Sequence, residues 1–257
     1  TLNRELTQTL KQLKEDVKAG RRIQLQLLPE DNQSFGSYTF RRRLYPSTYL
    51  SGDFVDYFPV DDRHVGFYMA DVSGHGAASA FVTVMLNTLV IQYRDALHLS
   101  GDDTILHPQQ TLMRLNRDIC RQNLDKHLTL FYGVIDLEKN TLLYSNAGQF
   151  PYPLQYDGHE ILTLECRGRP LGLFEDAQYK AWRCELPREF CLVLVSDGIL
   201  ELMSQASLLE KYGALLSDTH GMEQDMDEMA SALDVVAGKH LPDDIAFLVI
   251  NRRHDDD

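Results

Sequence analysis

The sequence predicts an α+β fold in which mainly antiparallel sheets combine with helices. Segments with the residue pattern of strands occur in runs, and pairs of helix-like segments interrupt these runs. In a doubly wound parallel fold, strands and helices would alternate one to one along the chain. The sequence has no internal repeat and, between residues 30 and 250, no linker-like stretch rich in proline, glycine and serine. We therefore predict one domain preceded by an N-terminal helix.

Residues 1–28 are predicted to form this linker or regulatory helix. Four apolar residues recur at spacings of three and four, which places them on one face of a helix. They are Leu6, Leu10, Leu13 and Val17. Pro29 ends the helix, because proline disfavours helical geometry in the residue before it. Two interpretations stay open: the helix packs on its own domain, or it continues from an upstream domain and pairs with a second copy.

Residues 29–257 form the predicted domain, which changes of period and turn residues divide into elements. Strands are expected at 38–45, 53–60, 64–71, 129–136, 141–146, 152–156, 161–165, 178–185, 191–196 and 245–251. Helices are expected at 77–97, 108–123, 198–203 and 222–239. The first of these helices is apolar nearly all round in its first half, so we expect it to be buried between layers.

Composition and charge exclude several classes of protein. The 257 residues include 25 basic and 38 acidic side chains, a net charge of −13 that repels nucleic acid and anionic lipid at long range. The compact basic cluster at 41–43 is interpreted as a solvated strand end. No apolar run approaches the roughly 20 residues that span a bilayer, and the charged N-terminal segment is no signal peptide. We expect a cytoplasmic protein without nucleic-acid or membrane partners.

The cysteines give no sign of a metal site or a disulfide framework. Cys120, Cys166, Cys184 and Cys191 show no C-x-x-C spacing and lie among apolar neighbours, so we expect reduced thiols. The sequence also lacks the G-x-G-x-x-G, P-loop and H-E-x-x-H motifs, which argues against dinucleotide binding, P-loop chemistry and zinc hydrolysis.

Acidic residues stand repeatedly at the ends of predicted strands. Asp53 begins one strand, whereas Asp71 and Asp197 follow two apolar strands. Asp243 and Asp244 precede the last strand. A single aspartate in such a place is usually a turn former or a helix cap. Several carboxylates brought together would repel one another and could not all stay ionised without a cation.

Oxygen ligands are those that Mg²⁺ and Mn²⁺ prefer. Two such ions some 3.5–4 Å apart can acidify a bridging water and clamp a phosphoryl group for in-line attack. Gly74 and Gly76 would let a phosphate approach the backbone closely. From the residues alone, the sequence indicates a divalent-metal site and leaves its chemistry open, with phosphoryl transfer as one candidate.

Seven short motifs in order over residues 20–250 resemble those of the SpoIIE/RsbU branch of the PPM (PP2C-like) protein serine/threonine phosphatases. They lie at 23–29 (IQLQLLP), 51–56 (SGDFVD), 71–76 (DVSGHG), 146–148 (NAG), 170–172 (PLG), 196–198 (SDG) and 243–245 (DDI). Three positions depart from the family pattern. Gln149 replaces a frequent histidine, Ser51 replaces a glycine, and Ala246 replaces a common threonine. None of these departures removes a carboxylate.

The resemblance implies a four-layer αββα sandwich of two mainly antiparallel sheets with flanking helices. It also implies a binuclear Mg²⁺ or Mn²⁺ centre at one end of the sheets. By motif position, Asp71 would bridge the two ions and the Val72 backbone carbonyl would bind one of them. Asp197 and Asp243 would hold one ion, and Asp53 would serve the other directly or through water.

Other acidic and histidine residues have less defined roles. Asp243 is preferred to Asp244 because the family ligand is the first residue of its D-[DN] pair. Asp56 is expected directly behind the ligands. For His75, a catalytic role and a helix-entry position both stay open, because eukaryotic relatives have their histidine at the position of Ser73.

The implied activity is that of a metal-dependent protein serine/threonine phosphatase. Metal-activated water would attack the phosphoserine or phosphothreonine of a regulatory partner, an anti-sigma-factor antagonist, without a phospho-enzyme. The alternative is a non-catalytic PP2C-like adaptor that binds a sigma factor or another regulatory protein. Adaptors of that kind normally lose metal carboxylates, which this chain keeps. A plain acidic domain without activity is the third alternative.

The resemblance further implies that the N-terminal helix carries signals from a sensor or receiver domain on the same polypeptide. Because the chain opens with Thr1 instead of Met, we expect the C-terminal output domain of a longer regulator, such as an RssB-like response regulator. We also expect that repositioning the helix changes how well Asp53 joins the metal site. A homodimer through the helix is a further expectation.

Overall fold

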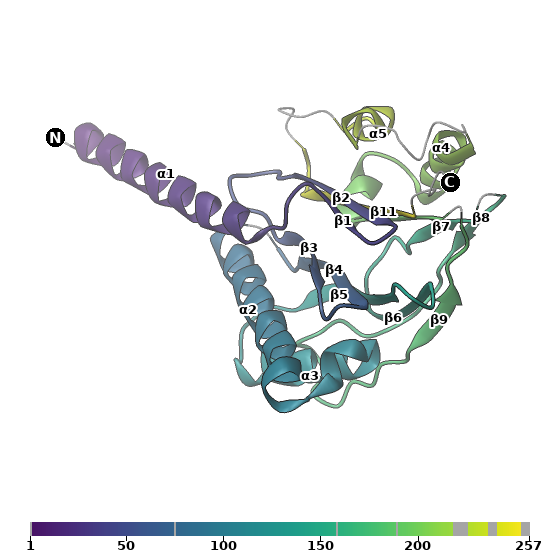
Figure 1. The fold of residues 1–257 in the computed structure, drawn as a ribbon. Coiled ribbons are helices and arrows are strands. Elements are labelled where there is room, and N and C mark those ends of the chain that lie inside the picture. The colour runs from purple at the N-terminus through teal and green to yellow at the C-terminus, as the bar shows by residue number, and fades with distance from the viewer. Residues whose placement is uncertain are drawn as a thin grey trace.

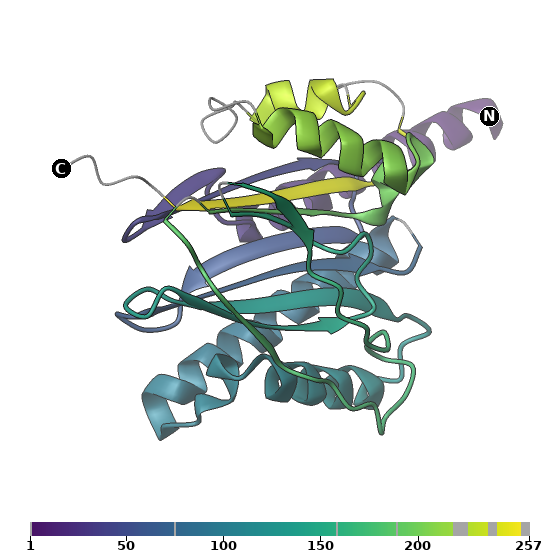
Figure 2. The same cartoon turned by 90° about the vertical axis from the view of Figure 1, so that its right-hand side faces the viewer.

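The computed structural model describes residues 2–74, 76–157, 159–188, 190–217, 226–235 and 241–252. Two antiparallel sheets stack face to face, and helices cover both outer faces (Figures 1 and 2). Helices α2 and α3 lie on one side of the sandwich, and α4 and α5 lie on the other. The predicted α+β fold and its four αββα layers are confirmed.

The first sheet has six strands in the order β1-β2-β11-β10-β7-β8. Their bounds are Asn32–Phe35, Tyr38–Tyr45, Ile245–Arg252, Cys191–Val195, Leu154–Tyr156 and Ile161–Thr163. Strand β1 was not predicted, because its residues are polar or small until Phe35 and every second one is exposed. A left-handed Gly36 (φ +55°) starts the tight turn that pairs β1 with β2.

The second sheet has five strands in the order β3-β4-β5-β6-β9. Their bounds are Asp53–Pro59, His64–Val72, Leu128–Asp136, Thr141–Ala147 and Trp182–Glu185. The last strand is shorter than the predicted 178–185, since its partner β6 pairs with it only from Tyr144 to Thr141.

Six helical elements of the described chain flank the sheets, and a seventh, α1, precedes them. The six are α2 (Ala77–Ser100), η1 (Asp103–Leu106), α3 (Pro108–Arg121), η2 (Asp197–Glu201), α4 (Gln205–Ser217) and α5 (Met226–Ala232). The predicted helix 198–203 is a short 3₁₀ turn, and α4 was not predicted. Helix α5 lies inside the predicted 222–239, of which 222–225 and 236–239 lie outside the described residues.

Three apolar layers hold the sandwich together. Alternate residues of β4 face opposite ways: Phe67 and Met69 pack between the two sheets, whereas Tyr68 packs toward α2 and α3. A third layer, which includes Val193 and Phe247, lies beneath α4 and α5. Strands buried on both faces explain the near-continuous apolar runs in the sequence.

Helix α2 is not buried all round, contrary to the prediction. One face packs on the second sheet through residues such as Ala80 and Leu86. Phe81, in the same apolar stretch, is 72% exposed. An apolar sequence indicates burial by some partner, and within the described residues nothing covers this side of the helix.

Helix α1 (Leu2–Leu27) projects away from the sandwich (Figure 1). Leu6, Leu10 and Leu13 are each about half exposed. Near the other end of the helix, Gln24 is buried, and its side chain binds Ser51 and Thr83 of the domain. One end of the helix therefore packs on its own domain, and the apolar stripe lies free of it.

Three further expectations concern the cysteines, the basic cluster and the membrane. All four cysteines are free thiols, as predicted, but only Cys166 and Cys191 are buried as expected, whereas Cys120 and Cys184 are half-buried. The basic cluster is no solvated strand end: its residues lie half-buried within β2, and Arg42 and Arg43 form ion pairs with Asp31. Among the described helices, none is both long and apolar enough to cross a membrane.

Candidate metal centre

Strand register places two of the predicted ligands directly opposite each other. Asp53 at the start of β3 and Asp71 near the end of β4 are paired residues of the antiparallel ladder. Both follow the alternation that sends Val55 and Met69 into the space between the sheets. Their carboxylates therefore meet at one end of the sandwich, between the two sheets.

The other sheet brings its acidic residues to the same end. Strands β10 and β11 are neighbours, so Asp197, which follows β10, lies near Asp243, which precedes β11. Ser196 joins the two segments, since its amide donates to the Ala246 carbonyl at 3.1 Å and its hydroxyl accepts from the Ala246 amide at 2.9 Å.

Mutual repulsion shows that these carboxylates form one electrostatic cluster. Burial raises the pKa of Asp53 well above its usual range, and the neighbouring Asp71 raises it further. Burial, together with Asp197 and Asp243, raises the pKa of Asp71 to about 7. Burial and Asp243 raise the pKa of Asp197. The structure thus brings together all four predicted carboxylate residues.

One oxygen of this cluster has no hydrogen-bond partner among the residues that the structure describes. Asp53 is 2% exposed, and its Oδ2 atom is buried without a hydrogen bond. Leaving a buried carboxylate oxygen unpaired is costly unless a cation or a proton compensates it. Asp71 is half-buried and Asp197 is exposed, so the cluster opens to solvent on one side.

The donor set suits a hard divalent cation. It consists of carboxylate oxygens with the Val72 carbonyl close by, and such oxygens are the ligands of Mg²⁺ and Mn²⁺. In the described part of the chain, no group of three or more His, Cys, Asp or Glu side chains is arranged to hold a metal by itself. An ion bound here would therefore complete its shell with backbone carbonyl and water oxygens, as Mg²⁺ commonly does.

Glycines allow the backbone to close tightly around Asp53 and Asp71. A Cβ atom on Gly52 would lie 2.9 Å from the Val72 carbonyl oxygen, so another residue there would displace a predicted ligand. Gly74 and Gly76 adopt left-handed φ angles of +76° and +84°, which glycine tolerates best. The prediction for His75 lies outside the described residues.

Lys126 and His127 fix the loop after Asp71. The Lys126 Nζ atom donates to the Ser73 carbonyl at 2.7 Å. The Ser73 amide donates to the His127 carbonyl at 2.9 Å, and the His127 amide donates to Ser73 Oγ at 3.2 Å. Lys126 was not predicted as part of the site, because no local pattern links it to a loop 53 residues away in the sequence.

Asp244 has a different environment from Asp243. Its carboxylate accepts hydrogen bonds from the Ser47 amide and hydroxyl at 2.6 and 2.8 Å, and from the Gly52 amide at 2.8 Å. These bonds tie the start of β11 to the residue before Asp53. Asp244 is thus a positioning residue, which agrees with the preference for Asp243 as a ligand.

Gln149 bridges the two sheets behind the carboxylates. It is buried, accepts from Thr129 Oγ1 at 3.1 Å and donates to the Val195 carbonyl at 3.4 Å. The backbone amide of Gln149 donates to Asn146 Oδ1 at 2.7 Å, which gives the NAG motif a structural role. The residue that departs from the family pattern is therefore well accommodated.

Asp56 lies away from the centre, contrary to expectation. It is three residues from Asp53, so it faces the other side of β3, where Asn87 of α2 donates to it at 3.1 Å. Burial raises the pKa of Asp56 to about 7.

The fold and the acidic end between two antiparallel sheets define a PP2C-like phosphatase domain. A family model described as "Stage II sporulation protein E (SpoIIE)" matches residues 61–253. This chain belongs to the SpoIIE family.

Curated relatives and solved structures agree with this assignment. The chain is 32% identical over 170 residues to phosphoserine phosphatase RsbU of Bacillus subtilis (65% of this chain, 48% of the relative). It is 28% identical over 206 residues to phosphoserine phosphatase RsbP of the same organism (77% and 48%). The chain thus spans about half the length of these relatives. The SiaA-PP2C domain of Pseudomonas aeruginosa shares the fold, with a TM-score of 0.74 and 20% identity over 95% of this chain and 98% of that one.

The environment of Asp56 predicts a specific dependence of stability on pH. The folded protein holds the Asp56 proton up to about pH 7, whereas the unfolded chain releases it near pH 3.9. The contribution of Asp56 to the free energy of unfolding therefore falls as the pH rises from about 4 to about 7. We expect Asp56→Asn to be more stable than wild type above pH 7, by about 1 kcal/mol or more, and this advantage to shrink toward pH 4. Urea unfolding across this range measures it; a difference independent of pH contradicts the assignment.

The buried Oδ2 atom of Asp53, which has no hydrogen bond, predicts opposite effects of Asp53→Asn on two quantities. These are the melting temperature without metal and the rise of the melting temperature with Mn²⁺. Asp53→Asn removes a buried charge and its repulsion from Asp71, so the metal-free variant is expected to melt no lower than wild type. Mn²⁺ is expected to raise the melting temperature of wild type, because it binds the folded state, and to do so much less in the variant. Asp62→Asn, in the exposed β3–β4 turn, is the matched control. A lower metal-free melting temperature with an intact Mn²⁺ response contradicts the prediction.

Proposed function

We propose that this chain is a metal-dependent serine/threonine phosphatase domain that dephosphorylates a regulatory partner protein. The observation that carries the proposal is the convergence of four separated aspartates around a buried, unpaired carboxylate oxygen in a member of the SpoIIE family. The names of the relatives RsbU and RsbP, both phosphoserine phosphatases, support it.

In this proposal the residues divide the work of holding two Mg²⁺ or Mn²⁺ ions. Asp71 would contribute to both ions and the Val72 carbonyl to one of them. Asp197 and Asp243 would hold one ion from the opposite sheet, and Asp53 would serve the other directly or through water. When bound, such a pair of ions clamps phosphoryl oxygens and acidifies a water for in-line attack on phosphorus.

The remaining residues keep this arrangement in place and accessible. Asp244 holds Gly52, so the backbone at Asp53 cannot drift from Asp71. A Cβ atom on Gly76 would meet no atom of the described residues within 4 Å, which is consistent with space for a substrate chain at this loop. Without cations, the clustered carboxylates would repel a phosphate monoester, which makes activity dependent on metal.

The partner we propose is a phosphorylated anti-sigma-factor antagonist, and the proposed location is the cytoplasm. The acidic charge of −13 disfavours nucleic acid as a partner. The adaptor alternative has less support, because a protein that only binds has no need to keep four carboxylates in mutual repulsion, with Asp53 buried and Asp71 half-buried among them.

Phosphate release tests the proposed function. With Mn²⁺, the protein is expected to hydrolyse a phosphoserine peptide and p-nitrophenyl phosphate, and Asp71→Asn and Asp197→Asn are each expected to lower kcat/KM more than about 100-fold, since even residues behind a ligand are worth about 10–100-fold. Asp62→Asn, in an exposed turn, is the control. Metal-loaded protein without activity, or variants indistinguishable from wild type, would overturn the proposal.

We further propose that α1 transmits a signal from a sensor or receiver domain on the same polypeptide, with a second copy pairing along Leu6, Leu10 and Leu13. The contact that supports it is Gln24. Its Nε2 donates to the Ser51 carbonyl at 2.7 Å and to Thr83 Oγ1 at 3.0 Å, and its Oε1 accepts from the Ser51 amide at 3.1 Å. A shift of α1 therefore pulls on the residue two positions before Asp53.

Removing the Gln24 contact is expected to loosen the metal site. Gln24→Ala should raise the Mn²⁺ concentration for half-maximal activity about tenfold, which corresponds to about 1.4 kcal/mol and is the cost of one or two lost hydrogen bonds. Gln26→Ala changes an exposed glutamine of the same helix and is the control. The melting temperature in Mn²⁺ titrations gives an independent readout. Equal Mn²⁺ requirements in both variants and wild type contradict the proposed coupling.

A further inference from the structure

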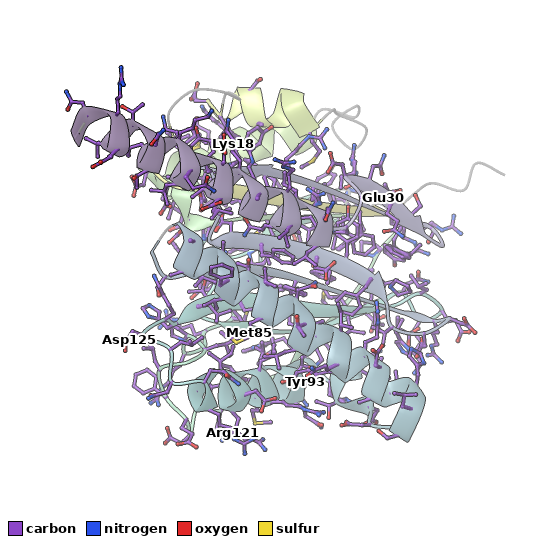
Figure 3. The ribbon with its side chains drawn as sticks, turned by 90° about the vertical axis from the view of Figure 1, so that its left-hand side faces the viewer. Lys18, Glu30, Met85, Tyr93, Arg121 and Asp125 are labelled. Carbon is purple, nitrogen blue, oxygen red and sulfur yellow. The ribbon has the colours of Figure 1, made fainter. Side chains whose placement is uncertain are left out.

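An apolar groove lies beside the candidate metal centre. It has a volume of about 480 Å³, and Met85 and Asp125 mark its side of the molecule in Figure 3. Residues of α2 and of the segment before β5 line it: Ala78, Phe81, Val82, Met85, Leu124, Asp125 and Lys126.

The groove exposes more apolar surface than a folded chain needs to. Phe81 is 72% exposed, although it stands between the buried Ala80 and Val82, and Leu124 is 41% exposed. Scattered exposed apolar residues are ordinary, but a contiguous apolar groove with a polar rim is typical of a binding surface.

Lys126 connects the groove to the loop of the metal centre. Its Nζ atom donates to the Ser73 carbonyl at 2.7 Å and lies where a Cβ atom of Gly74 would be only 2.9 Å away. Ser79 Oγ, at the start of α2, donates to the same carbonyl at 3.2 Å. The cationic end of the groove is therefore in contact with the residues that follow Asp71.

We propose that this groove receives an apolar side chain of the phosphoprotein substrate, at a fixed distance from its phosphoserine; the proposal rests on the function proposed above. Charge complementarity favours this occupant. A phosphoserine carries nearly two negative charges, and a substrate that reaches the centre places this charge toward Lys126, with the apolar surface beyond it.

The size of the groove favours a transient substrate over a second copy of the chain. A stable protein–protein interface buries roughly 800 Å² on each partner, whereas a groove lined by seven residues encloses a few side chains. Its lining on α2 runs from Ala78 to Met85. This stretch is about 10 Å long at a rise of 1.5 Å per residue. An extended peptide covers that length in about three residues. The groove therefore holds about three residues of an extended peptide, and a scan of leucine positions locates the one that fits it.

Phosphoserine peptides test this inference. The probes are synthetic peptides of one sequence, each with a single leucine at a different position on one side or the other of the phosphoserine, and the all-alanine peptide as reference. We expect one leucine peptide to exceed the alanine peptide about tenfold in kcat/KM, as burial of one such side chain allows. Phe81→Ala should bring this ratio close to one. Leu124→Ala, which shortens a lining side chain of the segment before β5, should also reduce it.

Controls separate docking from damage to the centre. Leu99→Ala removes a leucine that is 86% exposed at the far end of α2, and it should keep the ratio of wild type. Hydrolysis of p-nitrophenyl phosphate, measured with every variant, reports the centre alone and normalises the peptide rates. Melting temperatures identify a variant that fails to fold, in which case Leu124→Ala supplies the test.

Several outcomes would overturn the inference. Hydrolysis of all peptides at one rate does so, as does a leucine preference that survives both Phe81→Ala and Leu124→Ala. A dimer that Phe81→Ala dissociates in sedimentation assigns the groove to a second copy. If p-nitrophenyl phosphate is not hydrolysed at all, the proposed function fails. Fluorescence anisotropy with fluorescently labelled forms of the same peptides then tests whether the groove binds a leucine side chain. Equal Kd values for the leucine and alanine peptides reject the inference.

Discussion

Repulsion among aspartates is the constraint on which the rest of this structure depends. Asp53, Asp71, Asp197 and Asp243 come from four separate segments. Burial and the neighbouring carboxylates raise the pKa values of Asp53, Asp71 and Asp197. Such a cluster destabilises the metal-free fold at neutral pH. The buried Oδ2 atom of Asp53 adds an unmet bonding requirement. A divalent cation would relieve both costs, and this supports the proposed metal centre.

Two β-ladders and one buried carboxylate impose this arrangement. The β3–β4 register sets Asp53 opposite Asp71, and the pairing of β10 with β11 brings Asp197 beside Asp243. Asp244 then joins the sheets by accepting bonds from the Ser47 and Gly52 amides. The rigid sandwich therefore holds mutually repelling groups that no single segment could hold, and α1 and the groove on α2 both adjoin the same centre.

Local sequence patterns predicted most of the strands and several of the helices, although helix α4 was missed. Alternation predicted β2 with its observed bounds, and the strand-end positions predicted the aspartates that converge. The polar β1 forms only because Gly36 turns it onto β2, and so it was missed. Apolar character placed α2 between layers, yet Phe81 faces outward, because periodicity cannot distinguish a buried face from one that awaits a partner. Bonds of Asp244 and Lys126 across long sequence separations leave no local pattern.

Anomalous scattering from crystals grown with Mn²⁺ tests the central claim most directly. Two manganese peaks are expected between the two sheets, near Asp53, Asp71, Asp197, Asp243 and the Val72 carbonyl, and both should disappear in crystals of Asp71→Asn. Absence of manganese from this end of the sandwich, or peaks confined to other acidic residues, would contradict the account of these carboxylates as a metal centre.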